Sequence, residues 1–284
     1  ARRDGKEENR ESRAALVAAG IEVRDSNPKF ALTHQKSMVI DDETGFVESL
    51  NWEIRDLTET RDYAIVTTNA KEVAEMVACF EADWARQPFA PAPDSRLIWC
   101  PGYGRERVAR FIDTAKHRLI LQNERYQDTV IIERLVRAAN RGVRLEIMAR
   151  PPHTLKTGKL IEGVGGLRIM RDVGAKIHRL ADLKLHAKAI IADGERAIIG
   201  SINLSPGSFD DRRELAIEVD GRHVLDRLNE VAAHDWKHSK PIDLSDEGLR
   251  RDLEKHGGEG LDKVALEASP EGAKAHGRRH DDRS

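Results

Sequence analysis

Hydrophobic and polar positions alternate along residues 185–192 in a way that predicts a β-strand. The run is apolar except for His186 and Lys188, and an Asp193-Gly194 turn connects it to a second apolar run at residues 196–200. Because side chains alternate across a strand, two polar residues two positions apart are expected on the same face. The pattern therefore predicts a β-hairpin that presents an imidazole and an ammonium group side by side.

Two further polar side chains follow the return strand of this hairpin. Ser201 and Asn203 are again two positions apart, at the end of the second apolar run. An imidazole that exchanges a proton, beside fixed hydrogen-bond donors and a positive charge, suits the chemistry of a phosphate ester. For Asp193 we favour a structural role, because aspartate is common in turns for backbone reasons.

The whole polar pattern occurs twice in the chain, at a constant separation of 152 positions. The first copy lies at residues 32–51, and its register extends to Arg61-Asp62 and Asp83-Trp84, which match Arg213-Glu214 and Asp235-Trp236. An ungapped match in which polar residues persist while apolar residues drift indicates an internal duplication. The candidate site residues are the pairs His34 and His186, Lys36 and Lys188, Asp41 and Asp193, Ser49 and Ser201, Asn51 and Asn203, and Asp62 and Glu214.

Strand and helix patterns alternate through the second half of the chain. Residues 105–116 and 129–140 have apolar side chains at helical spacing, whereas residues 117–123 and 143–149 have the pattern of short strands. This alternation predicts an α/β fold in which each repeat forms a mixed β-sheet flanked by helices. A further short strand is expected at residues 21–23, before the first hairpin.

The duplication divides the chain into parts. They are the first repeat at 1–86, a proline-rich linker at 87–93, the second repeat at 94–240 and a charged tail at 241–284. At the offset of 152, residue 1 corresponds to residue 153, so we expect the first repeat to be truncated at its N-terminus and the chain to be a fragment or to begin after processing. A signal peptide lost in this way would leave the compartment unknown. No apolar run approaches the ~18 to 20 residues of a membrane span, which is compatible with a soluble or peripheral membrane protein.

The two motifs resemble those of the phospholipase D superfamily. HAKAIIAD with GSIN, and HQKSMVID with SLN, carry the resemblance, which covers roughly residues 14–240. It implies two phospholipase D-like repeats that share one active site and need no cofactor. One departure is Glu48, where the family usually has glycine and where the second copy has Gly200. The added side chain is expected to disturb the phosphate contacts of the first half-site.

The resemblance also implies how the two histidines divide the reaction. One attacks the phosphorus of a phosphodiester and the other protonates the leaving oxygen, so that cleavage passes through a phosphohistidine intermediate. We expect His34 to be the nucleophile and His186 the general acid, with their rings within about 6 Å of each other across one cleft.

The remaining paired residues are expected to support the histidines. Lys36 and Lys188 would neutralise the non-bridging phosphate oxygens, with the two asparagines as further donors and the two serines beside them. Asp62 and Glu214 each follow the histidine of their own repeat by 28 positions and would orient it. No metal site is expected, because a lysine near each histidine would repel a cation.

Charge and composition leave the substrate open. The resemblance favours a phospholipid, hydrolysed or transferred to an alcohol, and peripheral contact with a membrane surface. The net charge is −6 over residues 1–93 (12 basic, 18 acidic) but +7 over residues 94–240 (27 basic, 20 acidic), and a basic half could attract nucleic acid. The alternatives are a metal-independent nuclease of the same superfamily and a non-catalytic phosphate-binding module. The only two cysteines, Cys79 and Cys100, imply neither a disulfide framework nor a zinc site.

Overall fold

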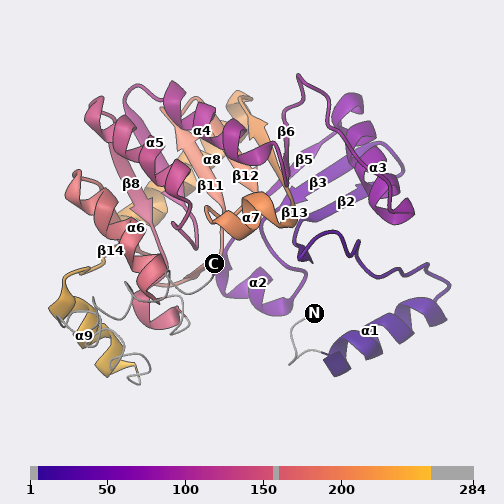
Figure 1. The fold of residues 1–284 in the computed structure, drawn as a ribbon, viewed down its shortest axis with the longest axis horizontal. Helices are drawn as coiled ribbons and strands as arrows, with labels where there is room; N and C mark the ends of the chain where they lie inside the picture. Colours follow the sequence, from indigo (N-terminus) through magenta and orange to yellow (C-terminus); the bar gives the residue numbers. More distant parts are fainter. Residues whose placement is uncertain (1–5, 156–159, 257–284) are drawn as a thin grey trace, which may run out of the picture.

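The computed structural model describes residues 6–155 and 160–256 (Figure 1). The helices are α1 Lys6–Ala18, α2 Ile54–Thr58, α3 Ala70–Ala85, α4 Gly104–Thr114, α5 Thr129–Asn140, α6 Leu160–Asp172, α7 Pro206–Asp210, α8 Arg222–Lys237 and α9 Asp246–Lys255, with a 3-10 turn at Pro152–Thr154. The strands are β1 Leu32–Thr33, β2 Lys36–Ile40, β3 Thr44–Glu48, β4 Thr60–Arg61, β5 Ala64–Thr67, β6 Leu97–Cys100, β7 Arg118–Gln122, β8 Arg144–Met148, β9 Lys176–Arg179, β10 Lys184–Leu185, β11 Ala189–Ala192, β12 Arg196–Gly200, β13 Arg212–Val219 and β14 Lys240–Pro241.

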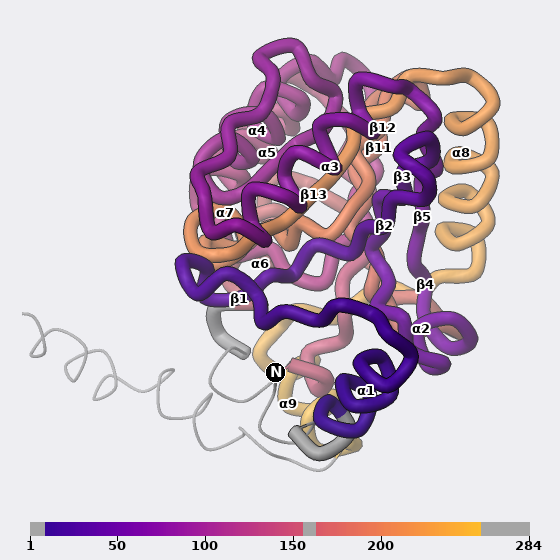
Figure 2. The backbone as a smooth tube through the Cα atoms, turned by 90° about the vertical axis from the view of Figure 1, so that its right-hand side faces the viewer, coloured from indigo at the N-terminus to yellow at the C-terminus, as the bar shows by residue number. Residues whose placement is uncertain are grey.

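The strands form one large sheet and two small ones. The nine-stranded sheet has the order β1-β13-β12-β11-β7-β8-β9-β14, with β6 paired to β13; a three-stranded sheet has the order β2-β3-β5, and β10 pairs with β4. The central strands β7, β8 and β9 are parallel, whereas β11 pairs antiparallel with β7 and β12, and β12 pairs antiparallel with β13. Figure 2 shows α4 and α5 on one face of the large sheet and α8 on the other. The predicted α/β fold with mixed sheets flanked by helices is confirmed.

Helix α5 shows how local sequence defines these elements. The Asp128 side chain accepts a hydrogen bond from the backbone N–H of Ile131, which satisfies one of the free donors at the start of the helix. Ile131, Leu135 and Ala138 lie on one stripe and are buried against the sheet. The chain then turns at Gly142, whose φ of +90° is readily adopted only by glycine.

The sheets of the two repeats pack on each other and share a core. Val47 of β3 and Ile65 of β5 belong to the same buried cluster as Ile199 of β12 and Leu215 of β13. The equivalent hairpins of the duplication therefore meet across this interface, and the edge of the interface carries both histidine motifs.

The repeats also exchange short strands at this edge. Leu32 and Thr33 of β1 pair in parallel with the start of β13 in the second repeat. At the same offset of 152, Lys184 and Leu185 of β10 pair in parallel with β4 in the first repeat. Each histidine motif is therefore preceded by a short strand that pairs with a strand of the other repeat.

This exchange corrects two details of the predicted strands. The segment 185–192 is not one continuous strand: it is interrupted at residues 186–188, where the chain leaves β4 and joins its own sheet as β11. Residues 21–23, which follow helix α1, form no strand. A strand is stable only when its backbone N–H and C=O groups pair with a neighbouring strand, and this three-residue segment has no such neighbour in the described structure.

The structure can be compared with the predicted linker and with part of the predicted tail. Residues 87–93 contain neither helix nor strand. Part of the predicted tail is folded, because Leu249 and Leu253 of α9 are buried in the main core. Residues 257–284, where the tail prediction continues, lie outside the described residues. No helix in the described ranges has both the length and the apolar character needed to cross a bilayer.

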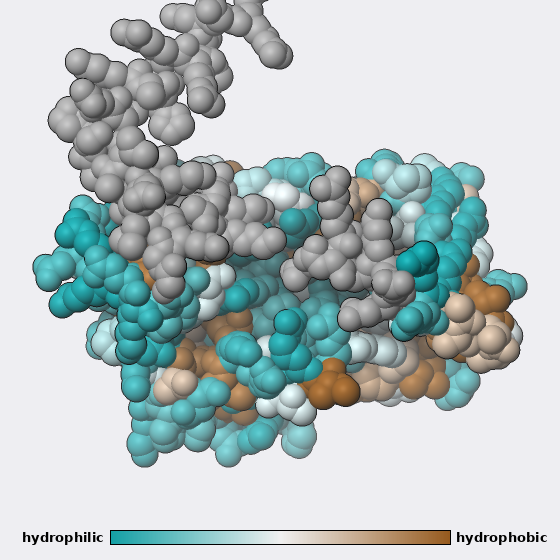
Figure 3. All heavy atoms as spheres, turned by 90° about the horizontal axis from the view of Figure 1, so that it is seen from below, coloured by the Kyte–Doolittle hydropathy of each residue, from teal (hydrophilic) through white to brown (hydrophobic). Residues whose placement is uncertain are grey.

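One surface differs between the repeats. Trp52, Ile54 and Leu57, on α2 and the loop before it, are 62%, 82% and 68% exposed. Leu204 and Phe209, the counterparts of Trp52 and Leu57, are buried. Helix α2 lies at the lower edge of Figure 1, and Figure 3 shows this side of the molecule as a hydrophilic surface broken by apolar patches. The apolar side chains of α2 are therefore displayed beside the edge that carries the histidine motifs.

Candidate active site

The two histidines are held by carboxylates from the opposite repeats. Nδ1 of His34 lies 2.8 Å from Oε2 of Glu214, and Nδ1 of His186 lies 3.0 Å from Oδ1 of Asp62. The predicted partners are therefore right in kind but wrong in assignment, because each carboxylate orients the histidine of the other repeat. With Nδ1 occupied, Nε2 is the nitrogen of each ring that is available for chemistry.

Both carboxylates are fixed in turn by hydroxyl groups. Ser49 donates to Asp62 over 2.6 Å, and its counterpart Ser201 donates to Glu214 over 2.6 Å. Thr60 contacts the second oxygen of Asp62, and Ser208 contacts that of Glu214. The two serines that the sequence analysis singled out therefore hydrogen-bond to the carboxylates that orient the histidines.

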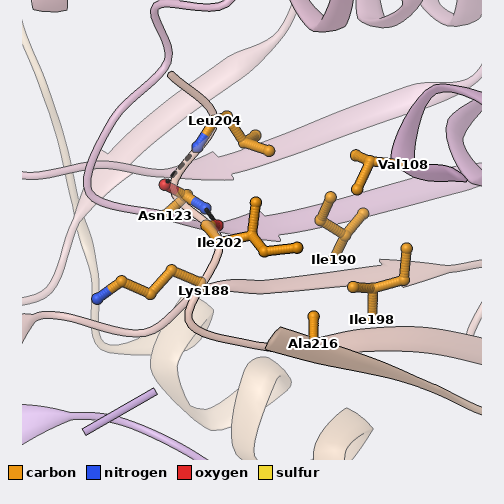
Figure 4. Close-up of a pocket in the computed structure, with 8 residues that line it drawn as sticks. All are labelled: Val108, Asn123, Lys188, Ile190, Ile198, Ile202, Leu204 and Ala216. Carbon is orange, nitrogen blue, oxygen red and sulfur yellow. Dashed lines mark hydrogen bonds between the residues drawn. The ribbon is translucent and has the colours of Figure 1, made fainter. Parts of the chain in front are cut away.

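The lysines lie beside the histidines as the spacing predicted. Nζ of Lys36 donates to the backbone oxygen of His34 over 2.6 Å, and Nζ of Lys188 donates to that of His186. Figure 4 shows the side chain of Lys188 extending to the left, away from the apolar side chains of Ile190 and Ile198. Lys188 is only 3% exposed, so its ammonium group needs an anionic partner.

The electrostatics indicate that the two half-sites are neighbours. Burial and the charge of Lys188 lower the pKa of Lys36 to about 8, against the opposing charges of Glu214, Glu124 and Asp62. An interaction between the charges of two lysines indicates proximity, since charges are screened over short distances in water. Convergence of both motifs on one site is thus supported, and the separation of the two rings stays a prediction.

The surroundings of the two histidines differ. Burial lowers the pKa of His34 below 6.5 more than Glu214 raises it, and Lys36 and Lys188 lower it further. His186 has three carboxylates within 4 Å: Asp62 and Asp56 at Nδ1, and Glu124 at Nε2. Around His34, the structure describes one carboxylate within that distance, which is Glu214. The duplicated sequence thus produces two unequal sites.

The two asparagines are also unequal. Asn51 donates from its side chain and its backbone N–H to Asp56, over 2.8 and 3.0 Å. Asn203 is 2% exposed, and its Oδ1 has no hydrogen-bond partner among the described residues. The counterpart of Asp56 is Ser208, which turns to Glu214 instead. Asn203 is thus the asparagine left to contact a substrate.

The turn aspartates lie in the hairpin turns, and Glu48 lies on β3 opposite Lys36 of β2. The Asp193 carboxylate accepts three backbone N–H groups, from Lys116, His117 and Arg118, which supports the structural role predicted for it. Asp41 is exposed at the equivalent turn with a φ of +54°. Glu48 accepts a hydrogen bond from Nε1 of Trp52 over 2.5 Å. The carboxylate of Glu48, which departs from the family pattern, therefore contacts the indole of Trp52 and pairs with neither Lys36 nor Lys188.

Two site residues were not predicted from the sequence. Asp56 has no acidic counterpart in the second repeat, so the duplication gave no signal for it. Glu124 lies just after β7, in the polar run that follows a buried apolar strand, and such a change at a strand end is the signal that points to it. Its Oε2 is 3.1 Å from Nζ of Lys188.

Two groups of side chains offer ligand atoms close together. Asp56, Asp62 and His186 form one group in the site, and His153, Asp252 and His256 form another. In the second group the imidazoles of His153 and His256 are stacked, with centroids 3.7 Å apart and planes 13° from parallel. The nitrogen lone pairs lie in the ring planes, so those of two stacked rings do not converge on one ion. In the first group the carboxylates already hold His186 and Asn51.

Activity is expected to survive EDTA, because Lys36 and Lys188 supply the positive charge that a divalent ion would bring to the phosphate. The measurement is the initial rate on the best substrate before and after dialysis against the chelator. Loss of the rate in EDTA and its return with a divalent ion would contradict this.

Binding of sulfate is expected to weaken as pH rises through about 8, because Lys36 then loses its charge. The sign follows from the group: a lysine is charged below its pKa and neutral above it. Calorimetric Kd values between pH 6 and 10 test this, and sulfate keeps its own charge over that range. In Lys36→Arg the guanidinium stays charged, so the decline should move to higher pH. An unchanged profile in this variant would rule out Lys36 as its cause.

Comparisons with known proteins agree with the geometry. The family described as "Cardiolipin synthase, PLD-like domain" matches residues 3–84 and 108–236. Cardiolipin synthase B of Escherichia coli (strain K12) is 22% identical over 271 residues, covering 78% of this chain and 63% of that protein. The chain therefore spans less than two thirds of this relative's length.

Two solved structures share the fold over 82% of this chain. Polyphosphate kinase from Porphyromonas gingivalis has a TM-score of 0.62 at 17% identity, with 38% of that chain covered. Phosphatidylserine synthase from Haemophilus influenzae has a TM-score of 0.57 at 12% identity, with 70% of that chain covered. Together with the paired motifs and the family match over most of its length, these findings show that the chain belongs to the cardiolipin synthase-like, PLD-like domain family of the phospholipase D superfamily.

Proposed function

We propose that this protein is a phospholipase D-type phosphodiesterase that cleaves or transfers a phosphatidyl group through a phosphohistidine intermediate. The observation that carries the proposal is the crossed pairing of His34 with Glu214 and of His186 with Asp62. This pairing leaves two Nε2 atoms, each on a ring that a carboxylate orients, beside two lysines. Such an arrangement supplies a nucleophile, an acid and an anion site, which together are what phosphodiester exchange requires.

In the first step, Nε2 of His34 attacks phosphorus and forms an N–P bond. The P–O bond to the leaving group breaks, and the leaving oxygen takes the proton from Nε2 of His186. The lysine charges and the amide of Asn203 stabilise the negative charge that builds up on the non-bridging oxygens. Glu214 accepts the Nδ1–H of His34 and so stabilises the ring as it becomes positively charged.

In the second step, a hydroxyl of water or of an alcohol gives its proton to Nε2 of His186. Its oxygen attacks phosphorus, and the N–P bond to His34 breaks. The products are the acid or a new diester, and both histidines return to their starting state. This reversal of roles needs no further reactant.

The surroundings of the rings support this order of roles. A nucleophile must be neutral, and the pKa of His34 lies below the usual value for histidine because the ring is buried near two lysines. His186 has three carboxylates within 4 Å, and one of them, Glu124, lies at Nε2, the atom that exchanges a proton in this order of roles. The sequence alone, being nearly symmetric, gives no such distinction.

A phospholipid is the substrate that we favour over nucleic acid. The named relatives include a cardiolipin synthase and a phosphatidylserine synthase. The exposed side chains of Trp52 and Ile54 lie between Asn51 and Asp56, and that of Leu57 directly follows Asp56, so a lipid surface could contact the protein next to the site. Peripheral membrane contact is part of this proposal.

A substrate panel tests the proposal on the full chain. It contains vesicles of phosphatidylglycerol and of phosphatidylcholine, single-stranded and double-stranded DNA, and bis-p-nitrophenyl phosphate. We expect release or exchange of the lipid headgroup and co-sedimentation with vesicles. Cleavage of DNA without lipid turnover would establish the nuclease instead. Binding of phosphate without turnover of any diester would establish a binding module.

A further inference from the structure

Glu124 places a carboxylate inside the proposed anion site. Its side chain is 12% exposed, with Oε2 3.1 Å from Nζ of Lys188 and 3.7 Å from Nε2 of His186. Oε1 accepts a hydrogen bond from Nη1 of Arg150 over 2.9 Å. Glu124 thus borders the nitrogen that exchanges a proton with the leaving and the attacking oxygen.

The group is anionic despite its burial. Burial opposes ionisation, but the charges of Lys188, His186 and Arg150 lower the pKa of Glu124 to about 2. An ionised carboxylate only accepts hydrogen bonds, and it repels the non-bridging oxygens of a phosphate. Its chemistry therefore suits a part of the substrate other than the phosphate, next to the oxygen that His186 serves.

The kind of group that Glu124 would contact follows from the charge around it. Lys188 and Arg150 already pair with its carboxylate, so an ammonium group would bring a third cation to a single negative charge. A neutral hydroxyl donates one hydrogen bond without adding charge. A hydroxyl on the carbon next to the reacting one would lie within reach of both His186 and Glu124.

We propose that Glu124 is a specificity-determining residue for the acceptor, accepting a hydrogen bond from a second hydroxyl of a polyol while His186 takes the proton of the first. This inference rests on the proposed function. In the transfer step, the first hydroxyl loses its proton to Nε2 of His186, its oxygen bonds to phosphorus, and the N–P bond breaks. The second hydroxyl keeps its proton and only donates it in a hydrogen bond.

A competition between two acceptors isolates this contact. Phosphatidyl-p-nitrophenol is the donor, and glycerol and 1-propanol are supplied together at equal concentration. Both products arise from the same phosphohistidine, so their ratio is independent of the first step and of the amount of folded protein. The variants are Glu124→Met, which lacks an acceptor atom, and Glu124→Gln, which keeps one oxygen. Glu146→Gln is the matched control, because Glu146 is also buried and paired with arginines but belongs to the middle of β8.

We expect the ratio of phosphatidylglycerol to phosphatidylpropanol to fall at least tenfold in Glu124→Met, as for loss of a hydrogen bond to a charged group. Glu124→Gln should give an intermediate ratio, and Glu146→Gln the ratio of the unaltered protein. The release of p-nitrophenol, measured in parallel in both Glu124 variants, separates an effect on the first step from an effect on the product ratio.

Three results would overturn the proposal while leaving the proposed function in place. One is a ratio within twofold of the original in Glu124→Met. Another is loss of the p-nitrophenol release from both variants in folded protein, which would assign Glu124 to the first step. The third is a preference for ethanolamine over glycerol that disappears in Glu124→Met, since the carboxylate would then recognise an ammonium group. If the unaltered protein releases no p-nitrophenol, the proposed function itself fails.

Discussion

Replacing either His34 or His186 by alanine is expected to lower turnover of the diester that the substrate panel identifies by at least ~10³-fold. The two variants should differ on a substrate whose leaving group needs no proton. With phosphatidyl-p-nitrophenol, His186→Ala should release one equivalent of p-nitrophenol and then stop, because His34 still attacks but no base activates the acceptor. His34→Ala should release none, since no nucleophile remains.

The control for this pair is His223→Ala, on the exposed surface of α8, which should retain full turnover. Stopped-flow absorbance at high enzyme concentration measures the burst directly. A burst from His34→Ala and none from His186→Ala would reverse the roles of the two histidines. Equal bursts from both variants would mean that neither forms the covalent bond alone.

A second large effect is expected from the ion pairs that join the two repeats. Nε of Arg213 lies 2.8 Å from Oδ2 of Asp83, and its other nitrogen contacts Oδ1 over 2.9 Å. At the offset of 152 positions, Arg61 and Asp235 form the same bidentate pair in the opposite direction. Each arginine also accepts, at its backbone oxygen, a hydrogen bond from the backbone N–H of one of the two site histidines. The pairs therefore hold the interface and the active site together.

Asp83→Asn is expected to lower the free energy of unfolding by about 3 kcal/mol, because the 7%-exposed Arg213 side chain then lacks a compensating charge. Urea denaturation followed by circular dichroism measures the change. The control is Asp226→Asn, which removes an exposed partner of Arg222 and should change stability by less than about 0.5 kcal/mol. Equal stabilities of the two variants would contradict the importance of the buried pair.

The local elements of the second repeat could be predicted from the sequence with little error. The pattern placed α5 at 129–140, which are its bounds in the structure, and a helix at 105–116, where α4 spans Gly104–Thr114. Apolar periodicity and helix-end signals act within a few residues, so they are readable without knowledge of the fold. The paired site residues were found for a different reason, namely that the duplication marked them.

The crossed pairing could not be predicted, because a duplicated sequence does not distinguish contacts within a repeat from contacts between repeats. Asp62 with His34 and Glu214 with His186 give the same sequence pattern as the exchanged partners that the structure contains. The choice depends on β1 and β10, two-residue strands too short to leave a periodic signal. Asp56 and Glu124, which make the two half-sites unequal, lie outside the repeated pattern and so were missed.

The most direct test of the account is to locate the covalent bond to phosphorus. Unaltered protein is mixed with phosphatidyl-p-nitrophenol labelled at phosphorus, quenched in base within one turnover, digested and analysed by mass spectrometry. The account predicts the label on the peptide that contains His34. A label on His186 would contradict the assignment of roles, and no label on either histidine, with turnover intact, would contradict the covalent mechanism.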